Sequence, residues 1–379
     1  MKLLVLNAGS SSLRFELFQV KGWKVLFKGH IDGIGAKNHT QALSLALKTL
    51  KSKEVLSHPD ELLAIGHRVV HGGEKYQKPT RITPPILRDL EKLSDLAPLH
   101  NPPNLEGIRA CQKLLPQIPN IAVFDTAFHA TLPEHAYLYG LPYTLYKKQG
   151  IRKYGFHGTS HAYVSEQAIA WLKKNRLPHK NLITCHIGNG VSVTAIKNEK
   201  SIDTSMGFTP LEGAVMGTRA GSFDPAILLH LKATAAALDH LINHESGLLG
   251  LSGVSSDVRP LWAIAQNPKH RDHKKVLRAF KIFSYRLATI IAGYTAALGG
   301  LNALIFTAGI GENAWYLRRD ICAGLTHFGI KLNVQKNRAT IEGKLGPIHA
   351  SKNSIPVLVV RTHEELKIAM ESIKILQKK

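Results

Sequence analysis

Three short segments of small, polar residues each follow an apolar stretch that the sequence predicts to be a buried strand. They are Asn7-Ala8-Gly9-Ser10-Ser11-Ser12, His186-Ile187-Gly188-Asn189-Gly190 and Thr307-Ala308-Gly309-Ile310-Gly311-Glu312-Asn313. A tight turn of such residues exposes backbone N–H groups with little steric bulk, which suits the oxygens of a phosphate. One such turn is also common in proteins without a ligand. The three together point to nucleotide phosphates and a ribose or base.

Two familiar nucleotide-binding fingerprints are absent from these turns. A P-loop requires Gly-Lys followed by Ser or Thr after a four-residue spacer, and no turn contains that pattern. Gly309-Ile310-Gly311 lacks the third glycine of the Rossmann fingerprint. The turns therefore indicate another type of phosphate site.

The first two turns lie in similar surroundings, about half the chain apart. Apolar residues alternate after the first turn at Phe15 and Leu17, and after the second at Val191 and Val193. Both segments therefore read as a strand, a tight turn and a returning strand. A repeat of this length predicts a duplicated domain rather than a solenoid, and 379 residues suffice for about two domains.

The formal charge of +22 makes nucleic acid the first partner to consider. The basic residues are dispersed, however, and aromatic residues make up only 7% of the chain. We therefore do not expect nucleic-acid binding. Attraction of anionic small molecules and a charge bias of the source proteome both remain open as explanations.

The chain is predicted to be cytoplasmic and not to enter a membrane. No apolar run reaches the length needed to cross a bilayer, and the N-terminus lacks the pattern of a signal peptide. Cys111, Cys185 and Cys322 are far apart and have no CxxC spacing, so we expect them to be reduced and buried.

The order of predicted elements favours an α/β protein with mixed sheets. We expect strands at 3–6, 23–27, 62–65, 120–124, 182–185, 302–306 and 356–360, and helices at 40–50, 85–96, 225–241, 274–298 and 364–376. Asn104 is expected to cap a helix that runs to residue 115, and Thr159 or Ser160 a helix that runs to residue 172. Residues 204–225 form a long segment without periodicity, which favours a functional loop.

Seven motifs occur in one order along the chain: Asn7–Ser12, His67-Arg68-Val69-Val70-His71-Gly72-Gly73, Phe124-Asp125-Thr126-Ala127-Phe128-His129, Tyr154-Gly155-Phe156-His157-Gly158-Thr159-Ser160-His161, 186–190, Gly217-Thr218-Arg219-Ala220-Gly221 and 308–313. Because it contains this ordered set of motifs, the chain resembles the acetate kinase family over nearly its whole length. The resemblance implies two duplicated actin-like (ribonuclease H-like) domains, with mixed sheets flanked by helices and the active site in the cleft between them. We place these domains at 1–129 plus 365–379 and at 130–364.

The resemblance also implies an ATP-dependent acetate kinase that forms acetyl phosphate and ADP by direct in-line transfer, and reversibly ATP and acetate. Such a transfer needs positioning and positive charge rather than covalent catalysis. The implied catalytic residues are Asp125, His157 and Arg219, and the implied substrate-binding residues are Arg68, Val70, Leu99, Phe156 and Pro210. A carboxylate substrate is already ionised near pH 7, so we expect Asp125 to orient an arginine or the substrate rather than to remove a proton.

The implied cofactor is Mg²⁺, with Mn²⁺ as an alternative, held by Asn7 and Glu364. ATP or ADP would contact Ser10, Ser12, Arg14, His186, Ile187, Gly188, Asn189, Gly190, Asp257, Val258, Arg259, Gly309, Ile310, Gly311, Glu312 and Asn313. The family is generally homodimeric, so we expect a homodimer. Three segments depart from the family pattern: Arg14 replaces Lys, Ala220-Gly221-Ser222 replaces Ser-Gly-Asp, and His363 replaces Asn or Asp.

Rival functions remain open from the sequence. A propionate or butyrate kinase differs by one or two methylenes in the acid, and Val70 is bulky enough to favour acetate. A non-catalytic ATP-binding module of the actin or Hsp70 type would not need Arg68, His157 and Arg219 together. A nucleic-acid-binding protein would need clustered charge.

Overall fold

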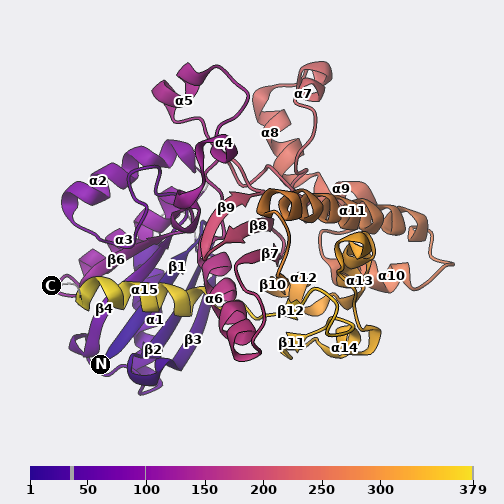
Figure 1. Cartoon of the computed structure of the whole chain (residues 1–379). Coiled ribbons are helices and arrows are strands. Elements are labelled where there is room, and N and C mark those ends of the chain that lie inside the picture. The colour runs from indigo at the N-terminus through magenta and orange to yellow at the C-terminus, as the bar shows by residue number, and fades with distance from the viewer. Residues whose placement is uncertain (35–37, 99, 378–379) are drawn as a thin grey trace. The chain divides into compact units, whose positions relative to one another are not determined.

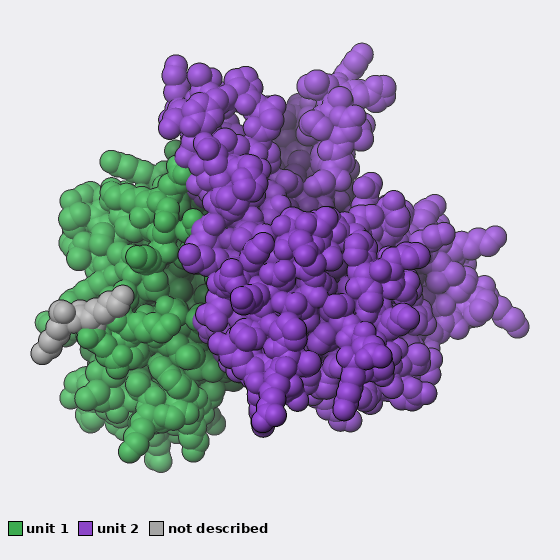
Figure 2. Space-filling model, in the orientation of Figure 1, with its two compact units in different colours: residues 1–130, 158–160, 363–379 green, residues 131–157, 161–362 purple. Residues whose placement is uncertain are grey.

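The structure is a computed structural model that describes residues 1–34, 38–98 and 100–377. Two compact units are distinguished in Figure 2. Unit 1 comprises residues 1–130, 158–160 and 363–379, and unit 2 comprises residues 131–157 and 161–362. The domain boundaries expected from the sequence stay a prediction.

Unit 1 contains a mixed six-stranded sheet with the order β3-β2-β1-β4-β6-β5. Its strands are β1 (Lys2–Ala8), β2 (Ser12–Gln19), β3 (Lys24–Asp32), β4 (Leu62–Val69), β5 (Thr80–Arg81) and β6 (Asn120–Phe124). The first three strands are antiparallel, β1, β4 and β6 are parallel, and β5 pairs antiparallel at the edge. The predicted hairpin is confirmed, with its turn reduced to residues 9–11.

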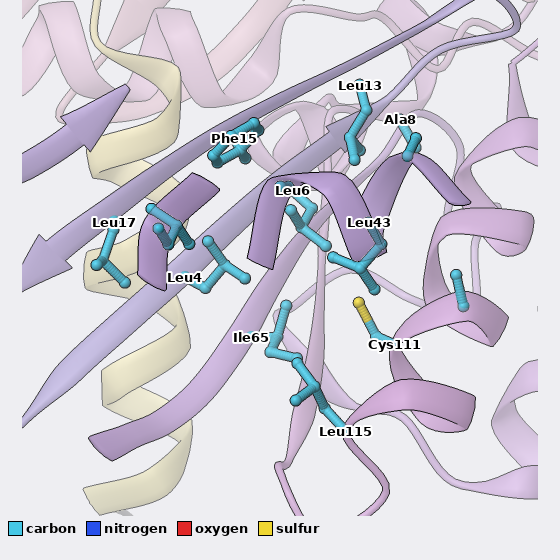
Figure 3. Packing of buried hydrophobic residues seen from close by; sticks show 14 of the residues in the cluster. Leu4, Leu6, Ala8, Leu13, Phe15, Leu17, Leu43, Ile65, Cys111 and Leu115 are labelled. Carbon is cyan, nitrogen blue, oxygen red and sulfur yellow. The ribbon is translucent and has the colours of Figure 1, made fainter. Parts of the chain in front are cut away.

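Helices bury both faces of this sheet (Figure 1). They are α1 (His39–Ser52), α2 (Pro84–Lys92), α3 (Asn101–Leu114) and α15 (Glu364–Gln377). Leu4 and Leu6 of β1 belong to the cluster that includes Leu43 of α1 and Cys111 of α3 (Figure 3). Leu3 and Val5 belong to a second cluster together with residues of α15. Because successive side chains of a strand point to opposite faces, burial on both faces explains the continuous apolar run of β1.

Unit 2 repeats the sheet order of unit 1 as β9-β8-β7-β10-β12-β11. Its strands are β7 (Asn181–Ile187), β8 (Val191–Lys197), β9 (Lys200–Thr204), β10 (Ala303–Thr307), β11 (Gly346–Pro347) and β12 (Val357–Val359). Parallel and antiparallel pairings also repeat in the same sequence. The predicted duplication of an actin-like topology is therefore confirmed.

The helices assigned to unit 2 include short ones where none was expected, such as those at 134–137 and 258–265, and they contradict two specific expectations. They are α4 (Glu134–Tyr137), α5 (Tyr143–Gln149), α6 (Gly158–Lys174, whose first three residues belong to unit 1), α7 (Ala226–Leu231), α8 (Ala235–His244), α9 (Gly247–Ser252), α10 (Val258–Ala265), α11 (His273–Leu298), α12 (Ala308–Asn313), α13 (Trp315–Ala323) and α14 (Val334–Ala339). The helix expected at 225–241 is two helices, separated after a left-handed Lys232. The third Gly-rich turn is mostly the short helix α12. Among the described helices, none is both long and apolar enough to cross a membrane.

Two predicted helix caps are wrong, because their side chains form other hydrogen bonds. Helix α3 begins at Asn101, so Asn104 lies inside it and hydrogen-bonds the backbone of Val70 and Ala8. Helix α6 begins at Gly158 with His157 as its N-cap, so Thr159 and Ser160, the predicted caps, lie inside the helix. Residues 205–225 contain no helix or strand, so the expected loop is confirmed, while its functional role stays a prediction.

The absence of a side chain at Gly66 in β4 allows α15 to pack closely on the sheet of unit 1. A Cβ there would lie 2.7 Å from Ser372 Oγ and 2.9 Å from Ile368 Cγ2, both on α15. We expect Gly66→Ala to destabilise the protein by about 1–3 kcal/mol and to lower its melting temperature. Gly293→Ala on α11 is the matched control, since a Cβ there meets nothing within 4 Å. It should be neutral or stabilising, because Ala favours helix over Gly. Equal melting temperatures for Gly66→Ala and wild type would contradict this close packing.

Candidate functional site

Half-buried Arg68 and buried Asp125 form an ion pair at the carboxyl ends of two neighbouring strands of the unit 1 sheet. Arg68 lies near the end of β4, and Asp125 directly follows β6. Arg68 Nε and Nη2 donate to Asp125 Oδ2 at 2.9 and 2.5 Å. Burial alone would lower the pKa of Arg68, but the charges of Asp125 and Glu364 outweigh it and raise that pKa. The guanidinium of Arg68 is therefore held in its charged form.

The other oxygen of Asp125 is also occupied. The hydroxyl of Thr159 donates to Asp125 Oδ1 at 2.7 Å, and the side chain of Asp125 is only 1% exposed. Both carboxylate oxygens thus accept hydrogen bonds from fixed donors. This arrangement suits a carboxylate that orients an arginine better than one that accepts a proton.

Asn7, Arg68 and Asp125 lie at one edge of the sheet, because β1, β4 and β6 are parallel neighbours. Asn7 pairs with Arg14 across the first hairpin. The structure therefore places these predicted residues of unit 1 at the carboxyl ends of strands, where open α/β sheets bind ligands.

Glu364, the first residue of α15, carries a buried carboxylate oxygen, Oε1, without a hydrogen-bond partner within the described part of the chain. Burial raises the pKa of Glu364, the charge of Arg68 opposes the rise and the charge of Asp125 adds to it, and together they bring that pKa to about 7. An unsatisfied buried carboxylate oxygen is costly, and a divalent cation is the kind of partner that would satisfy it. The chemistry of Glu364, with the amide oxygen available on Asn7, fits the expected Mg²⁺.

His363, one of the departures from the family pattern, contacts Glu16. Its Nε2 lies 2.9 Å from Glu16 Oε2, and Lys28 Nζ lies 2.7 Å from Glu16 Oε1. Burial would raise the pKa of Glu16, but hydrogen bonds from His363 and Lys28 lower it overall. His363 therefore takes part in an ionic cluster on β2 and β3 rather than merely facing solvent.

In unit 2, a chain of hydrogen bonds holds His157. Its Nδ1 lies 2.8 Å from Ser192 Oγ, and Ser192 Oγ lies 2.7 Å from His161 Nε2. His161 Nδ1 in turn lies 2.7 Å from Thr184 Oγ1. The His157 ring also stacks on His186, with ring centroids 4.1 Å apart. The backbone of His157 is left-handed, with φ of 56°, a conformation that is costly and is often found at functional sites.

Arg219 lies beside His157 over the second Gly-rich turn. A Cβ on Gly190 would be 2.9 Å from Arg219 Nη2 and 3.3 Å from His157 Cε1. Arg219 Nη1 donates to the carbonyl of Pro210 at 2.5 Å, and the guanidinium forms no ion pair with any described residue. Burial lowers the pKa of Arg219. A half-buried cation without a counter-ion is suited to receive an anion.

Hydrogen bonds position the segments around Asp257 and Glu312, two more of the nucleotide segments predicted from the sequence. Asp257 caps α10 by accepting from Arg259 N, and the two side chains form an ion pair at 2.5 Å. Glu312 Oε1 accepts from the backbone N–H of Ala308 at 2.9 Å and of Thr362 at 3.2 Å. Their roles in binding ATP stay predictions.

The residues expected to contact the acetate methyl are divided between the units. Val70 is buried in unit 1, while Phe156 is buried and Pro210 half-buried in unit 2. Leu99 lies outside the described residues. The assignment of these four residues to one acid pocket therefore stays a prediction.

Sequence reasoning missed the residues that support the functional side chains. His161 belongs to one of the motifs but was assigned no role of its own, and Ser192 and Asn104 received no functional role. Ser192 and His161 are fully buried, and Asn104 is 4% exposed. The available signals were a polar residue within the largely apolar strand β8 for Ser192 and membership of a family motif for His161.

Comparison with known proteins agrees with this geometry. A family model described as the acetokinase family matches residues 34–370. The chain belongs to the acetokinase family. It is 46% identical to a curated acetate kinase from Clostridium botulinum over an alignment that covers 100% of both chains. The expected function, an ATP-dependent acetate kinase, is confirmed by this full-length homology.

Solved structures of this acetokinase's relatives have the same fold. The acetate kinase of Porphyromonas gingivalis superposes with a TM-score of 0.92 at 40% identity, covering 99% of this chain and 100% of the other. A propionate kinase from Francisella tularensis subsp. tularensis gives a TM-score of 0.90 at 40% identity, covering 98% and 99%.

The raised pKa of Glu364 predicts a pH-dependent cost to stability. Because its folded pKa of about 7 exceeds the ordinary value of 4.5, the fold favours the protonated form. The stabilisation is present below pH 4.5 and is lost as the pH rises through 7. In the presence of a chelator, Glu364→Gln should therefore gain melting temperature relative to wild type as the pH rises from 5 to 8. A constant difference across this range would contradict the buried, unpartnered carboxylate.

Proposed function

We propose that this acetokinase transfers the γ-phosphoryl group of ATP to acetate by direct in-line displacement. An acetate oxygen attacks the γ-phosphorus while the bond from that phosphorus to the bridging oxygen of ADP breaks. The ionised carboxylate has no proton to lose, so no general base is needed. The observation that carries the proposal is the pair of Arg219 and His157 over the turn at Gly190, where a half-buried cation has no counter-ion among the described residues.

Arg68 binds the carboxylate of acetate in this proposal. Its Nε and one N–H of Nη2 donate to Asp125, so the N–H groups of Nη1 and the second N–H of Nη2 remain to donate to the substrate. Asp125 fixes the plane of the guanidinium and keeps the cation stable in its buried position. Val70, Leu99, Phe156 and Pro210 would contact the methyl group.

Arg219 and His157 stabilise the charge that spreads over the oxygens of the transferring phosphoryl group. The guanidinium offers a planar fork to two oxygens, and the Ser192 hydroxyl holds the His157 ring in place. Both donors are fixed before the reaction, so little reorganisation is needed in the transition state.

Asn7 and Glu364 would hold Mg²⁺, or Mn²⁺ in its place, and the ion would neutralise phosphate charge. Arg14 and the serines of the first hairpin would lie near the phosphates. The segments 186–190, 257–259 and 309–313 would contact the rest of ATP or ADP.

The preferred acid is acetate in this proposal. The propionate kinase from Francisella tularensis subsp. tularensis is as similar to this chain as the Porphyromonas gingivalis acetate kinase in identity, so similarity alone does not fix the acid. Val70 is 5% exposed, and its N–H is bound by Asn104 Oδ1 at 3.1 Å. A buried, β-branched residue held in this way leaves little freedom to admit another methylene.

A homodimer in the cytoplasm completes the proposal. Ile227, Leu229 and Leu231 of α7 are 47, 81 and 46% exposed, and no described residue of α7 or α8 is buried. Exposed apolar patches often mark interfaces. Sedimentation should give twice the monomer mass, and Leu229→Asp should lower it.

The reaction is tested by trapping the acyl phosphate with hydroxylamine in the presence of ATP, Mg²⁺ and acetate. Arg219→Ala and His157→Ala should each lower kcat by about 100-fold or more, because each removes a donor used in the transition state. Arg176→Ala, at an exposed arginine of the same unit, should retain wild-type activity. A wild-type protein that binds ATP but yields no hydroxamate with any carboxylate would favour the ATP-binding module instead.

Acid preference is tested by Val70→Ala. Removing two methyl carbons should raise kcat/KM for propionate relative to acetate by about tenfold or more. The same hydroxamate assay with acetate, propionate and butyrate measures the ratio. If the ratio stays at the wild-type value, Val70 does not set the size of the acid pocket.

A further inference from the structure

We propose that α13 is a clamp that sets the spacing of two nucleotide-binding segments, and that Arg318 and Tyr316 are its positioning residues. The two segments are residues 257–259, which are the N-cap and first two residues of α10, and residues 309–313, which are all of α12 except its first residue. The inference rests on the proposed function, which assigns both segments to ATP. Neither Arg318 nor Tyr316 would itself touch the nucleotide.

Arg318 uses all five of its N–H groups inside unit 2. Nη1 donates to the carbonyls of Gly311 and Glu312 at 2.8 and 2.7 Å. Nε donates to the side chain of Asn337 at 2.8 Å, and Nη2 donates to the carbonyls of Asn337 and Thr340 at 2.8 and 2.7 Å. One residue therefore joins the end of α12 to α14 and the residue that follows it.

The guanidinium is 1% exposed and has no carboxylate among these partners. Burial lowers the pKa of Arg318 to about 10. Burying a cation is costly unless fixed dipoles replace its hydration. The carbonyls at the end of α12 carry the partial negative charge of a helix C-terminus, so the same interaction stabilises the arginine and fixes the carbonyls.

Tyr316 joins α13 to the other segment. Its hydroxyl donates to the carbonyl of Val258 at 3.2 Å. Its ring stacks on Trp262 of α10, with centroids 3.8 Å apart and an angle of 4° between the planes. Tyr316 and Arg318 are two residues apart, so one short helix holds both segments through backbone carbonyls.

This arrangement has a functional consequence because the contacts are made to backbone atoms. Gly309, Gly311 and Val258 offer little or no polar side chain with which to correct their own positions. Their contacts with a nucleotide depend on where the backbone lies. Misplacing a binding group by a fraction of a hydrogen-bond length weakens binding without changing the reacting groups.

The test compares Arg318→Lys, Tyr316→Phe and the control Arg319→Lys. Arg318→Lys keeps the charge but loses the planar fork, and Tyr316→Phe keeps the ring and removes only the hydroxyl. Arg319 is the neighbouring arginine, has a side chain 48% exposed, and pairs with Asp320 at 2.7 Å. For each protein we would measure KM for ATP, KM for acetate, kcat, melting temperature and the Kd of ADP by calorimetry.

We expect Arg318→Lys to raise KM for ATP and Kd for ADP by about tenfold or more, and Tyr316→Phe by about threefold, with KM for acetate within about twofold of wild type. Arg319→Lys should match wild type. A merely structural role would lower the melting temperature and the fraction of active enzyme but leave KM for ATP and Kd for ADP unchanged, and that result overturns the proposal. If Arg318→Lys does not fold, Tyr316→Phe decides by the same measurements.

Failure of the proposed function gives a different result. A wild-type protein that binds ADP but forms no acyl phosphate would remove the kinase assignment. The Kd of ADP in Arg318→Lys and Tyr316→Phe would still show whether α13 positions the two nucleotide-binding segments.

Discussion

The ion pair between Arg68 and Asp125 is the interaction on which the proposed substrate site of unit 1 depends. Two charges taken out of water are costly unless their geometry is good and their remaining hydrogen-bonding groups are satisfied. Here Asp125 receives two bonds from Arg68 and one from Thr159. The strands that carry Arg68 and Asp125 are parallel neighbours, so the sheet fixes the pair, and the pair fixes the face of the guanidinium left for a substrate.

Unit 2 contains a half-buried arginine whose surroundings differ from those of Arg68. Arg219 has a carbonyl partner but no counter-ion among the residues described, and burial lowers its pKa. One arginine is neutralised and oriented, and the other keeps an uncompensated charge beside His157. This difference matches the proposed roles: the first binds a ground-state carboxylate, while the second stabilises charge that develops on the phosphoryl oxygens.

Local features of the structure could be predicted from the sequence, and long-range ones could not. The two hairpins with their phosphate-type turns follow from alternating apolar residues and small turn residues, both of which act over a few positions. The caps assigned to Asn104 and Thr159 failed because each side chain has a partner far along the chain, at Ala8 and Asp125. The hydrogen bonds of Ser192 and Arg318 also join residues that are distant in sequence, and no local sequence pattern indicates them. The family motifs contain the residues proposed to carry the chemistry and two of their supports, Thr159 and His161, but not Ser192 or Asn104.

The central claim is that Asp125 acts through Arg68, and a double-mutant cycle tests it most directly. The measurement is kcat/KM for acetate in wild type, Arg68→Gln, Asp125→Asn and the double variant. If Asp125 only orients Arg68, the double variant should lose little more activity than Arg68→Gln alone. In the Arg68→Gln background, Asp125 no longer has an arginine to orient, so Asp125→Asn has nothing further to disrupt. If the two losses multiply, Asp125 contributes independently of Arg68, and the orienting role of Asp125 is contradicted.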